Sequence, residues 1–174
     1  MNGESIMPQE HILFAQHNDT CFFKLRGELR HTNATAMDDL IDRLFRQGQL
    51  HCAQVVIDLN EATFMDSTHI GLLASIARHC KAQDLPAPTL FSTHLEINDQ
   101  LVSLRLDEVF ELITQPTDQA VDFSAVTSSE HSEDKKARMI LRAHEALVEL
   151  NDANRTAFEP VVELLRAQLK NTTP

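Results

Sequence analysis

The chain has 174 residues, 43% of them apolar, and a formal net charge of −11. This length and apolar content favour a globular protein, with one ordinary domain and an appendage or two very small domains. Its aromatic residues are nine Phe, without Trp or Tyr, so stacking recognition of nucleic acid is not expected. The negative charge also disfavours phosphate backbones and anionic membranes, and a charged partner should be basic.

Charge divides the chain into two parts. Residues 133–174 contain seven Lys or Arg and seven Asp or Glu, so the whole acidic excess lies in residues 1–132. The serine-rich segment 124–134 has no hydrophobic periodicity, which is typical of a linker. We therefore predict a first domain over residues 1–115, a linker over 116–134 and a helical extension over 135–174.

The cysteines and the N-terminus bear on the compartment. Cys21, Cys52 and Cys80 are an odd number without a Cys-x-x-Cys pair, in apolar surroundings. This pattern differs from a disulfide-dense framework and favours a reducing cytoplasm. The first eight residues lack a basic start and an apolar stretch, and the apolar run at 70–77 is too short to cross a bilayer. We expect a cytoplasmic protein that binds no membrane.

The first elements in chain order are a hairpin, a helix and a strand. Apolar runs at 12–15 and 21–25, separated by His17-Asn18-Asp19, predict a β-hairpin. Thr32 or Asn33 would then cap an amphipathic helix that ends near Gly48. The apolar positions that predict this helix are Met37, Leu40, Ile41, Leu44 and Phe45. The β-branched run at 53–59 has the length and composition of a buried strand.

A second helix is predicted from Asp66-Ser67 to about Ala82, before Pro86. Its apolar stripe consists of Ile70, Leu73, Ala74, Ala77 and Cys80. Weaker signals predict a strand at 89–92, a short helix at 98–104 and a strand at 109–113. The resulting order, ββαβαβαβ, predicts an α/β fold in which helices pack against a layered sheet.

The extension has two apolar stripes at helical spacing, one at 137–148 and one at 158–169, separated by a break at 151–154. They predict a helical hairpin, because two isolated helices would be only marginally stable. Their apolar faces must be buried against each other, the first domain or a second subunit. The hairpin could therefore serve as a homodimerisation element or as a partner-selecting element, and the sequence does not separate the two.

The segment from Val55 to Leu73 resembles the sulphate-transporter and anti-sigma-antagonist (STAS) domain family. In that family a buried strand ending in Asp-Leu leads through a short loop to Asp-Ser-(Ser/Thr)-Gly-x-Gly at the start of a helix. The matching residues here are Asp58-Leu59 and Asp66-Ser67-Thr68-His69-Ile70-Gly71, where His69 replaces the usual glycine. Gly27-Glu28-Leu29 also matches the family's turn after its second strand. The resemblance covers about residues 11–115.

The resemblance implies a STAS-like mixed β-sheet and the function of an anti-sigma factor antagonist, which is a non-enzymatic regulator. It implies that a serine kinase phosphorylates Ser67, with Thr68 as the secondary candidate, and that a serine phosphatase removes the phosphate. The unphosphorylated form would bind the anti-sigma factor or kinase. We expect partner contacts at Asp66, Ser67, Thr68, His69 and Glu28, and no catalytic residue, metal or cofactor.

The chemistry of the Asp66-Ser67 position suits a switch. A phosphate adds about −1.5 to −2 charges and three strong acceptor oxygens. The free N–H groups at a helix N-terminus favour an anion, so phosphorylation of Ser67 should alter the surface and leave the fold intact. The alternative is that Asp66, Ser67 and Thr68 only cap the helix, as these residue types do in many proteins.

Other interpretations have less support in the sequence. The histidines and cysteines lack metal-ligand spacing, since His79-Cys80 is an adjacent pair. No Gly-x-Ser-x-Gly elbow surrounds Ser67, which disfavours a hydrolase nucleophile. The basic residues of the first tail helix alternate with acidic ones, which is typical of a solvated face and not of a nucleic-acid site. The main alternative function is a constitutive STAS scaffold subunit of a transport or signalling assembly.

Overall fold

The computed structural model describes residues 11–48, 51–117 and 120–172. The other positions, which belong to the predicted first domain, linker and extension, lie outside the described residues. The strands and helices of the described part are, in chain order, β1 (Ile12–His17), β2 (Thr20–Leu29), α1 (Thr35–Ile41), β3 (Gln54–Met65), α2 (Ser67–Ala82), β4 (Thr89–Phe91), α3 (Leu95–Ser103), β5 (Glu111–Ile113), β6 (Ser124–Ala125), α4 (Glu133–Val148) and α5 (Asp152–Thr172). Short 3-10 turns lie at His31–Asn33 and Leu106–Glu108, and a π-type turn at Asp42–Arg46.

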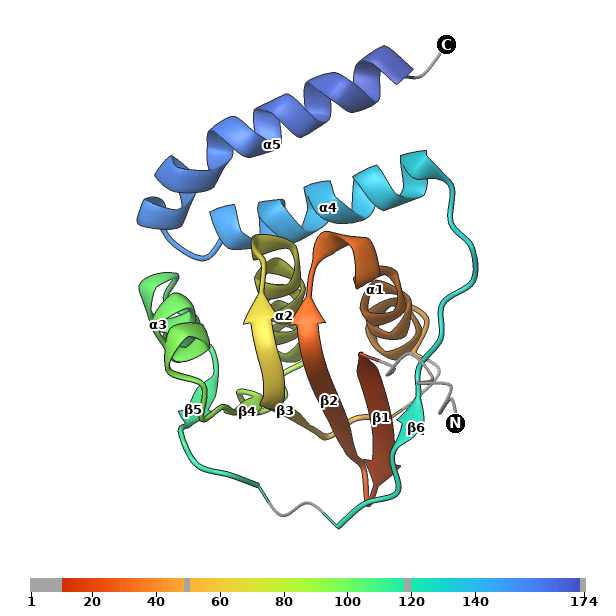
Figure 1. The fold of residues 1–174 in the computed structure, drawn as a ribbon, viewed down its shortest axis with the longest axis vertical. Coiled ribbons are helices and arrows are strands. Elements are labelled where there is room, and N and C mark those ends of the chain that lie inside the picture. Colours follow the sequence, from red (N-terminus) through yellow and green to blue (C-terminus); the bar gives the residue numbers. More distant parts are fainter. Residues whose placement is uncertain (1–10, 49–50, 118–119, 173–174) are drawn as a thin grey trace, which may run out of the picture.

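The strands form one mixed sheet in the order β5-β4-β3-β2-β1-β6 (Figure 1). β1 is antiparallel to both of its neighbours, whereas β2 to β5 run parallel to one another. Parallel neighbours need crossover connections, which α1, α2 and α3 supply. The predicted α/β class and the predicted order of elements are confirmed, with β6 as an additional edge strand.

The β1–β2 hairpin closes as its sequence predicts. His17 pairs with Thr20, so Asn18 and Asp19 form a two-residue loop. Both have positive φ values, 47° and 64°, as a type I′ turn requires. Asn and Asp tolerate this conformation better than most residues, which explains why the hairpin forms here.

Alternate side chains of the central strands point to opposite faces of the sheet. The main core lies on the face that α1 and α2 cover, behind the sheet in Figure 1, and receives from β2 and β3 the residues Cys21, Phe23, Leu25, Val55, Ile57 and Leu59. Phe22 and Val56 point to the other face, where they form a smaller cluster with Ala15. The sheet therefore buries apolar side chains on both faces.

The first helix begins differently from the prediction. α1 has Ala34 as its N-cap, with no side-chain hydrogen bond, so the predicted caps Thr32 and Asn33 are wrong. Asn33 instead accepts a hydrogen bond from the Arg30 backbone N–H at 3.0 Å and closes the preceding 3-10 turn. Because Asx side chains also stabilise turns, their presence alone does not locate the helix start.

The segment predicted as a linker is bound to the domain over much of its length. β6 pairs with the edge strand β1, and Val126 beside it is buried in the main core. Ser128 Oγ lies 3.0 Å from Thr35 Oγ1, and His131 Nε2 lies 2.7 Å from Asp39 Oδ2. These contacts attach the segment to α1 and lead the chain to α4.

α4 and α5 form the predicted helical hairpin. α4 lies across the ends of β2 and β3 and the start of α2, and α5 packs on its outer side (Figure 1). The α4 residues buried in this contact are Met139, Ala143, Ala146 and Leu147. The predicted break is shorter than expected, because Asn151 accepts a hydrogen bond from the Asn154 N–H at 2.8 Å and begins α5. The hairpin thus buries its faces against itself and the first domain.

The cysteines do not all remain unpaired, contrary to what their spacing in the sequence suggests. Cys21 and Cys52 form a disulfide with a Cα–Cα distance of 5.7 Å, whereas Cys80 is free and buried. Burial raises the pKa of the Cys80 thiol to about 11. The bond links the start of β2 to the segment before β3, two neighbours in the sheet. Spacing along the chain did not reveal this pair, because the fold brings together residues 31 positions apart.

The described residues contain neither a membrane-spanning helix nor a cluster of metal ligands. Within 11–48, 51–117 and 120–172, no helix combines the length and apolar character needed to cross a bilayer. Among the same residues, no three His, Cys, Asp or Glu side chains are grouped closely enough to hold a metal ion.

Candidate functional site

Asp66 joins the end of β3 to α2 and ties this junction to the loop after β2. Its backbone is extended, and its Oδ1 accepts the first-turn N–H of His69 at 3.1 Å, which makes Asp66 the N-cap of α2. Its Oδ2 accepts the backbone N–H of His31 at 2.6 Å. The capping interpretation therefore holds for Asp66 itself.

The protonation of Asp66 follows from these bonds. Burial would raise the pKa of its carboxyl, but the His69 ring, 3.7 Å away, and the two backbone N–H groups favour the ionised form and lower the pKa to about 2. Asp66 is therefore a carboxylate at neutral pH. It carries a fixed negative charge beside Ser67.

Ser67 is the first residue of α2 and is half-buried. Its Oγ lies 2.9 Å from Nε2 of His144 in α4. The other ring nitrogen of His144, Nδ1, lies 2.7 Å from the carbonyl oxygen of Ile140, which can only accept. Nδ1 therefore carries the hydrogen, and in the neutral ring Nε2 accepts from the Ser67 hydroxyl. Ser67 is bound by the extension and does not cap the helix.

Thr68 and His69 lie inside the protein. Thr68 is 3% exposed and His69 is 0% exposed, and neither ring nitrogen of His69 has a hydrogen-bond partner. The side chain that replaces the family's glycine thus fills the interior below the Asp66 loop. Both residues were predicted as partner contacts, and a partner cannot touch them in this conformation.

Glu28 is exposed at the end of β2, beside the Asp66 loop. Gly27 precedes it with a φ of 77°, and the β2–β3 pairing shifts register at this point. The predicted turn is therefore a bulge, and β2 continues to Leu29. The Glu28 carboxylate lies 3.3 Å from Nε of Arg30, so the bulge presents a charged pair at the surface.

Sequence reasoning missed three surface residues near Ser67. The Arg30 guanidinium lies 4.3 Å from the ring centroid of Phe64, which is 38% exposed. His31 donates to Asp66, as described above. An Arg stacked on an exposed aromatic ring is a common feature of protein-binding surfaces. Phe64 lies within the Val55–Leu73 segment that resembles the family, and a Phe in the predicted loop just before Asp66 was the available signal. Arg30 and His31 offered none.

His144 belongs to the apolar stripe predicted at 137–148, and Arg142 is one of the basic residues predicted to lie on a solvated face of the same helix. Arg142 Nη2 lies 2.9 Å from Oδ2 of the buried Asp38 in α1. Burial raises the pKa of Asp38 although Arg142 opposes this change. A Cβ built on Gly71 of α2 would lie 2.1 Å from the Ala143 carbonyl oxygen, so the two helix backbones are in direct contact. The extension is therefore an integral part of the site.

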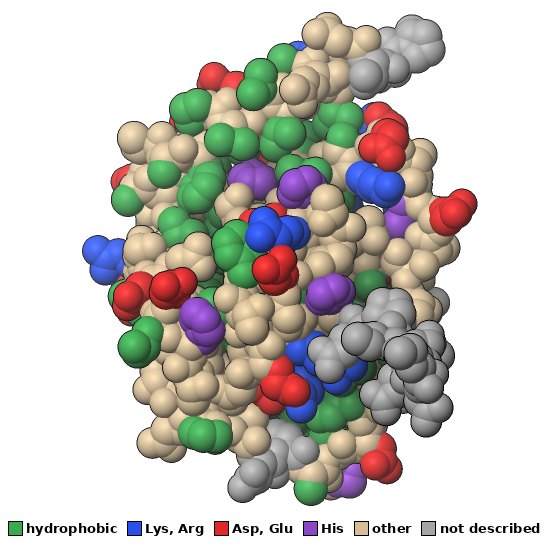
Figure 2. Space-filling view, in the orientation of Figure 1, with side chains coloured by type: hydrophobic (Ala, Val, Ile, Leu, Met, Phe, Trp, Pro, Cys, Tyr) green, Lys and Arg blue, Asp and Glu red, His purple; other side chains and the backbone are tan. Residues whose placement is uncertain are grey.

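Figure 2 shows the face of the molecule that is seen in Figure 1. Hydrophobic side chains gather over its upper part, where α4 and α5 lie, and acidic and basic side chains are interspersed over the rest. The large apolar residues that remain exposed among the described ones include Leu95 and Val102 of α3 and Val161 and Leu164 of α5.

The fold and the position of Ser67 define a class of protein. The STAS domain model matches residues 11–123, well over half of the chain, and the chain belongs to the STAS domain family. This is a regulatory, non-enzymatic family, and the resemblance inferred from the sequence is confirmed.

A solved structure with this fold is that of the Bacillus cell fate determinant SpoIIAA in its phosphorylated form. It is 19% identical in sequence, covers 60% of this chain and 92% of its own, and superposes with a TM-score of 0.50. At this identity the likeness concerns the fold. No curated protein matches the chain.

Proposed function

We propose that the protein is a phosphorylation-controlled anti-sigma factor antagonist in which Ser67 is the switch. The observation that carries the proposal is that Asp66 caps α2, which leaves the Ser67 hydroxyl unused by the helix. This arrangement occurs at the motif position of a STAS domain, in a fold also seen in phosphorylated SpoIIAA. A phosphate on Ser67 would lie at a helix N-terminus, which stabilises anions.

In this proposal the unphosphorylated protein binds an anti-sigma factor or serine kinase through the surface around Ser67. That surface, which we call the switch face, consists of Glu28, Arg30, His31, Phe64 and Ser67. Phosphorylation adds bulk and negative charge beside the ionised Asp66, which blocks the fit of the partner. A serine phosphatase restores the binding form. We place these reactions away from membranes and nucleic acid.

Mass-spectrometric mapping after incubation with anti-sigma-type serine kinases of the source organism tests the proposal. We expect one phosphate on Ser67, and none on the matched variants Ser67→Ala or Ser67→Ala with Thr68→Val. Phosphate on Thr68 alone, or no phosphate with any such kinase, would contradict the assignment of the switch.

A scaffold function is favoured by one observation, the Ser67–His144 hydrogen bond, because it uses the hydroxyl as a structural contact. In a constitutive subunit of a transport or signalling assembly, Ser67→Ala would leave complex formation unchanged. The antagonist predicts instead that phosphorylated and unphosphorylated forms bind differently. The same pull-down with the two forms separates the candidates.

Homodimerisation through the C-terminal helices is a separate part of the proposal. Val161 and Leu164 of α5 are 37% and 60% exposed, and a second copy could cover them. Sedimentation of the protein and of the variant Leu164→Glu tests this point. A dimer that the substitution dissociates would support it, and a monomer at high concentration would refute it.

The Ser67–His144 pair also has the spacing of a nucleophile and a base. However, His144 is only 5% exposed, and the described cavity of about 620 Å³ is lined by other residues. We therefore propose no enzymatic activity. Labelling of folded protein by a serine-reactive fluorophosphonate at Ser67 would overturn this assignment.

A further inference from the structure

The C-terminal hairpin covers the residue that the proposed function would modify. His144 is buried between α2 and α5, with its ring 5.9 Å from that of Phe158. Its Nε2 holds the Ser67 hydroxyl at 2.9 Å. A phosphoryl group adds a phosphorus atom and three oxygens to Oγ. Ser67 Oγ and His144 Nε2 are too close together to leave room for that group. A phosphate that points from Oγ towards His144 is therefore incompatible with α4 packed against α2.

The approach of α4 to α2 is too close to adjust by a small shift. One turn beyond Ser67, Gly71 contacts the Ala143 backbone so closely that a single added carbon would lie 2.1 Å from its carbonyl oxygen. The neighbouring side chains of Thr68 and Ile70 are also buried, so they cannot move aside to make space. Close-packed helices have discrete arrangements. Making space at Ser67 therefore requires α4 to move as a unit.

A kinase meets the same obstacle. Transfer of a phosphoryl group requires the hydroxyl oxygen to attack the γ-phosphorus in line, with its lone pair facing the nucleotide. The Ser67 hydroxyl instead faces His144, and the two residues that follow it are buried. The docked hairpin thus withholds Ser67 from an active site that must surround it.

We propose that the α4–α5 hairpin is a gate over Ser67. In the closed form, His144 holds the hydroxyl out of reach of the kinase active site; in the open form, α4 leaves α2 and Ser67 becomes a substrate. A phosphate on Ser67 then keeps the gate open. This inference rests on the proposed function, since it concerns the regulation of the same serine.

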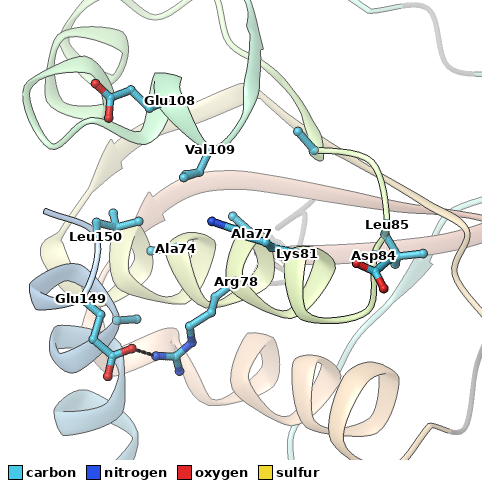
Figure 3. A pocket seen from close by; sticks show the side chains of 12 residues that line it. Ala74, Ala77, Arg78, Lys81, Asp84, Leu85, Glu108, Val109, Glu149 and Leu150 are labelled. Atoms are coloured by element: carbon cyan, nitrogen blue, oxygen red, sulfur yellow. Dashed lines mark hydrogen bonds and ion pairs between the residues drawn. The ribbon is translucent and has the colours of Figure 1, made fainter.

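Charged pairs join α4 to α1 and α2 at two points. Arg142 pairs with the buried Asp38 of α1 near the middle of α4, and Arg78 of α2 pairs with Glu149 at its C-terminal end. Figure 3 shows the Arg78–Glu149 pair at the edge of a cavity of about 620 Å³. The walls of this cavity include Ala74, Ala77, Ala146 and Leu150 from the two sides of the α2–α4 contact.

This cavity is open to solvent, and its walls include the charged residues Lys81 and Glu108. The contact between α2 and α4 therefore buries little apolar surface at this end. The Arg78–Glu149 pair is about half exposed and adds little stability. This end of the contact is thus weaker than a fully packed one, as a gate that opens without unfolding the sheet requires.

Hydrogen exchange measured on the full chain tests the gate without any kinase. Phosphoserine can be encoded at position 67 during translation, and a chain with phosphoserine in place of the exposed Asp122 is the matched control. We expect the amides of 139–147 to exchange about tenfold faster or more with phosphoserine at 67 than in the unmodified chain. The control should match the unmodified chain. Unchanged exchange at 139–147 with phosphoserine at 67 would overturn the gate.

A second arm measures the phosphorylation rate of Ser67. Arg142→Glu replaces the attraction to Asp38 by repulsion and should open the gate, whereas Lys135→Glu reverses an exposed charge in the same helix. We expect phosphorylation about fivefold faster or more in Arg142→Glu and unchanged in Lys135→Glu. Equal rates in a variant whose α4 amides exchange faster would refute the gate. If no kinase phosphorylates Ser67 in any variant, the proposed function is contradicted. The gate is still tested in that case, because the hydrogen-exchange experiment needs no kinase.

Discussion

At the residue scale, Asp66 is the fixed charge around which the site is built. Its two oxygens accept backbone N–H groups from α2 and from the loop after β2. Each such bond to a carboxylate is stronger than a neutral one. The His69 ring and these two bonds together favour the ionised form and lower the pKa of this group. The start of α2 and the switch face are thereby held together.

The pH dependence of stability tests this role of Asp66. Its pKa falls from an ordinary value of 3.8 to about 2 in the folded protein. The stabilisation is therefore complete above the unfolded value and is lost as the pH falls through about 2. A shift of this size corresponds to about 2 kcal/mol. We expect Asp66→Asn to lower the free energy of unfolding by about this amount at pH 7, as measured by urea denaturation.

The control for this experiment is Asp99→Asn, because Asp99 is exposed on α3. It should unfold like the original protein at every pH. The difference between the original protein and Asp66→Asn should shrink as the pH falls from 4 towards 2. A difference that stays constant over this range would show that the Asp66 charge does not contribute to stability.

At the element scale, the contact between α2 and α4 decides how Ser67 is presented. Small residues, Gly71 and Ala143, bring the two backbones together, and this closeness places His144 over Ser67. Ridges and grooves of helices set their distance through the size of the side chains at the crossing. The glycine of the family motif thus has a packing function in this chain.

Gly71→Ala tests the close contact between α2 and α4 through the sign of its effect on the free energy of unfolding. In an exposed helix this change stabilises by about 1 kcal/mol, because alanine favours helix. Here the added carbon collides with the Ala143 carbonyl, so we expect a loss of about 1–3 kcal/mol and faster hydrogen exchange in α4. Urea denaturation gives the first quantity. Stabilisation with unchanged exchange would mean that α4 does not lie against Gly71.

At the scale of the whole molecule, the disulfide closes a loop between β2 and β3. Cys21 and Cys52 are separated by 31 positions, and a crosslink over such a loop stabilises by about 2–4 kcal/mol through the unfolded state. Thiol titration of denatured, unreduced protein should therefore detect Cys80 only. We expect Cys52→Ser to lower the free energy of unfolding by this amount. Three titratable thiols would contradict the bond.

The sequence predicted local structure well and long-range contacts poorly. The limits of α2 followed from its cap and its apolar period, and the β1–β2 turn from Asn18-Asp19. β3 extends six residues past the apolar run, because pairing with the bulged β2 continues beyond it. β6 has only two residues and owes its form to its neighbour β1. Local patterns carry no information on such pairing.

The same division holds for the candidate site. Asp66 and Ser67 were found from a motif, because the chemistry of a helix start is local. His144 lies 77 positions from Ser67, and its spacing on α4 is that of an ordinary core residue. The partner of Cys21 and the burial of His69 were hidden for the same reason. A contact between distant elements is decided by packing, which the sequence alone does not display.

Calorimetric titration of the cognate anti-sigma factor into two forms of the full chain tests the central claim most directly. One form is unmodified and the other carries encoded phosphoserine at position 67. The account predicts that the unmodified form binds and that phosphoserine, whose bulk and charge block the fit, weakens binding about 100-fold or more, which corresponds to about 3 kcal/mol. Equal affinity of the two forms would contradict the assignment of Ser67 as the switch.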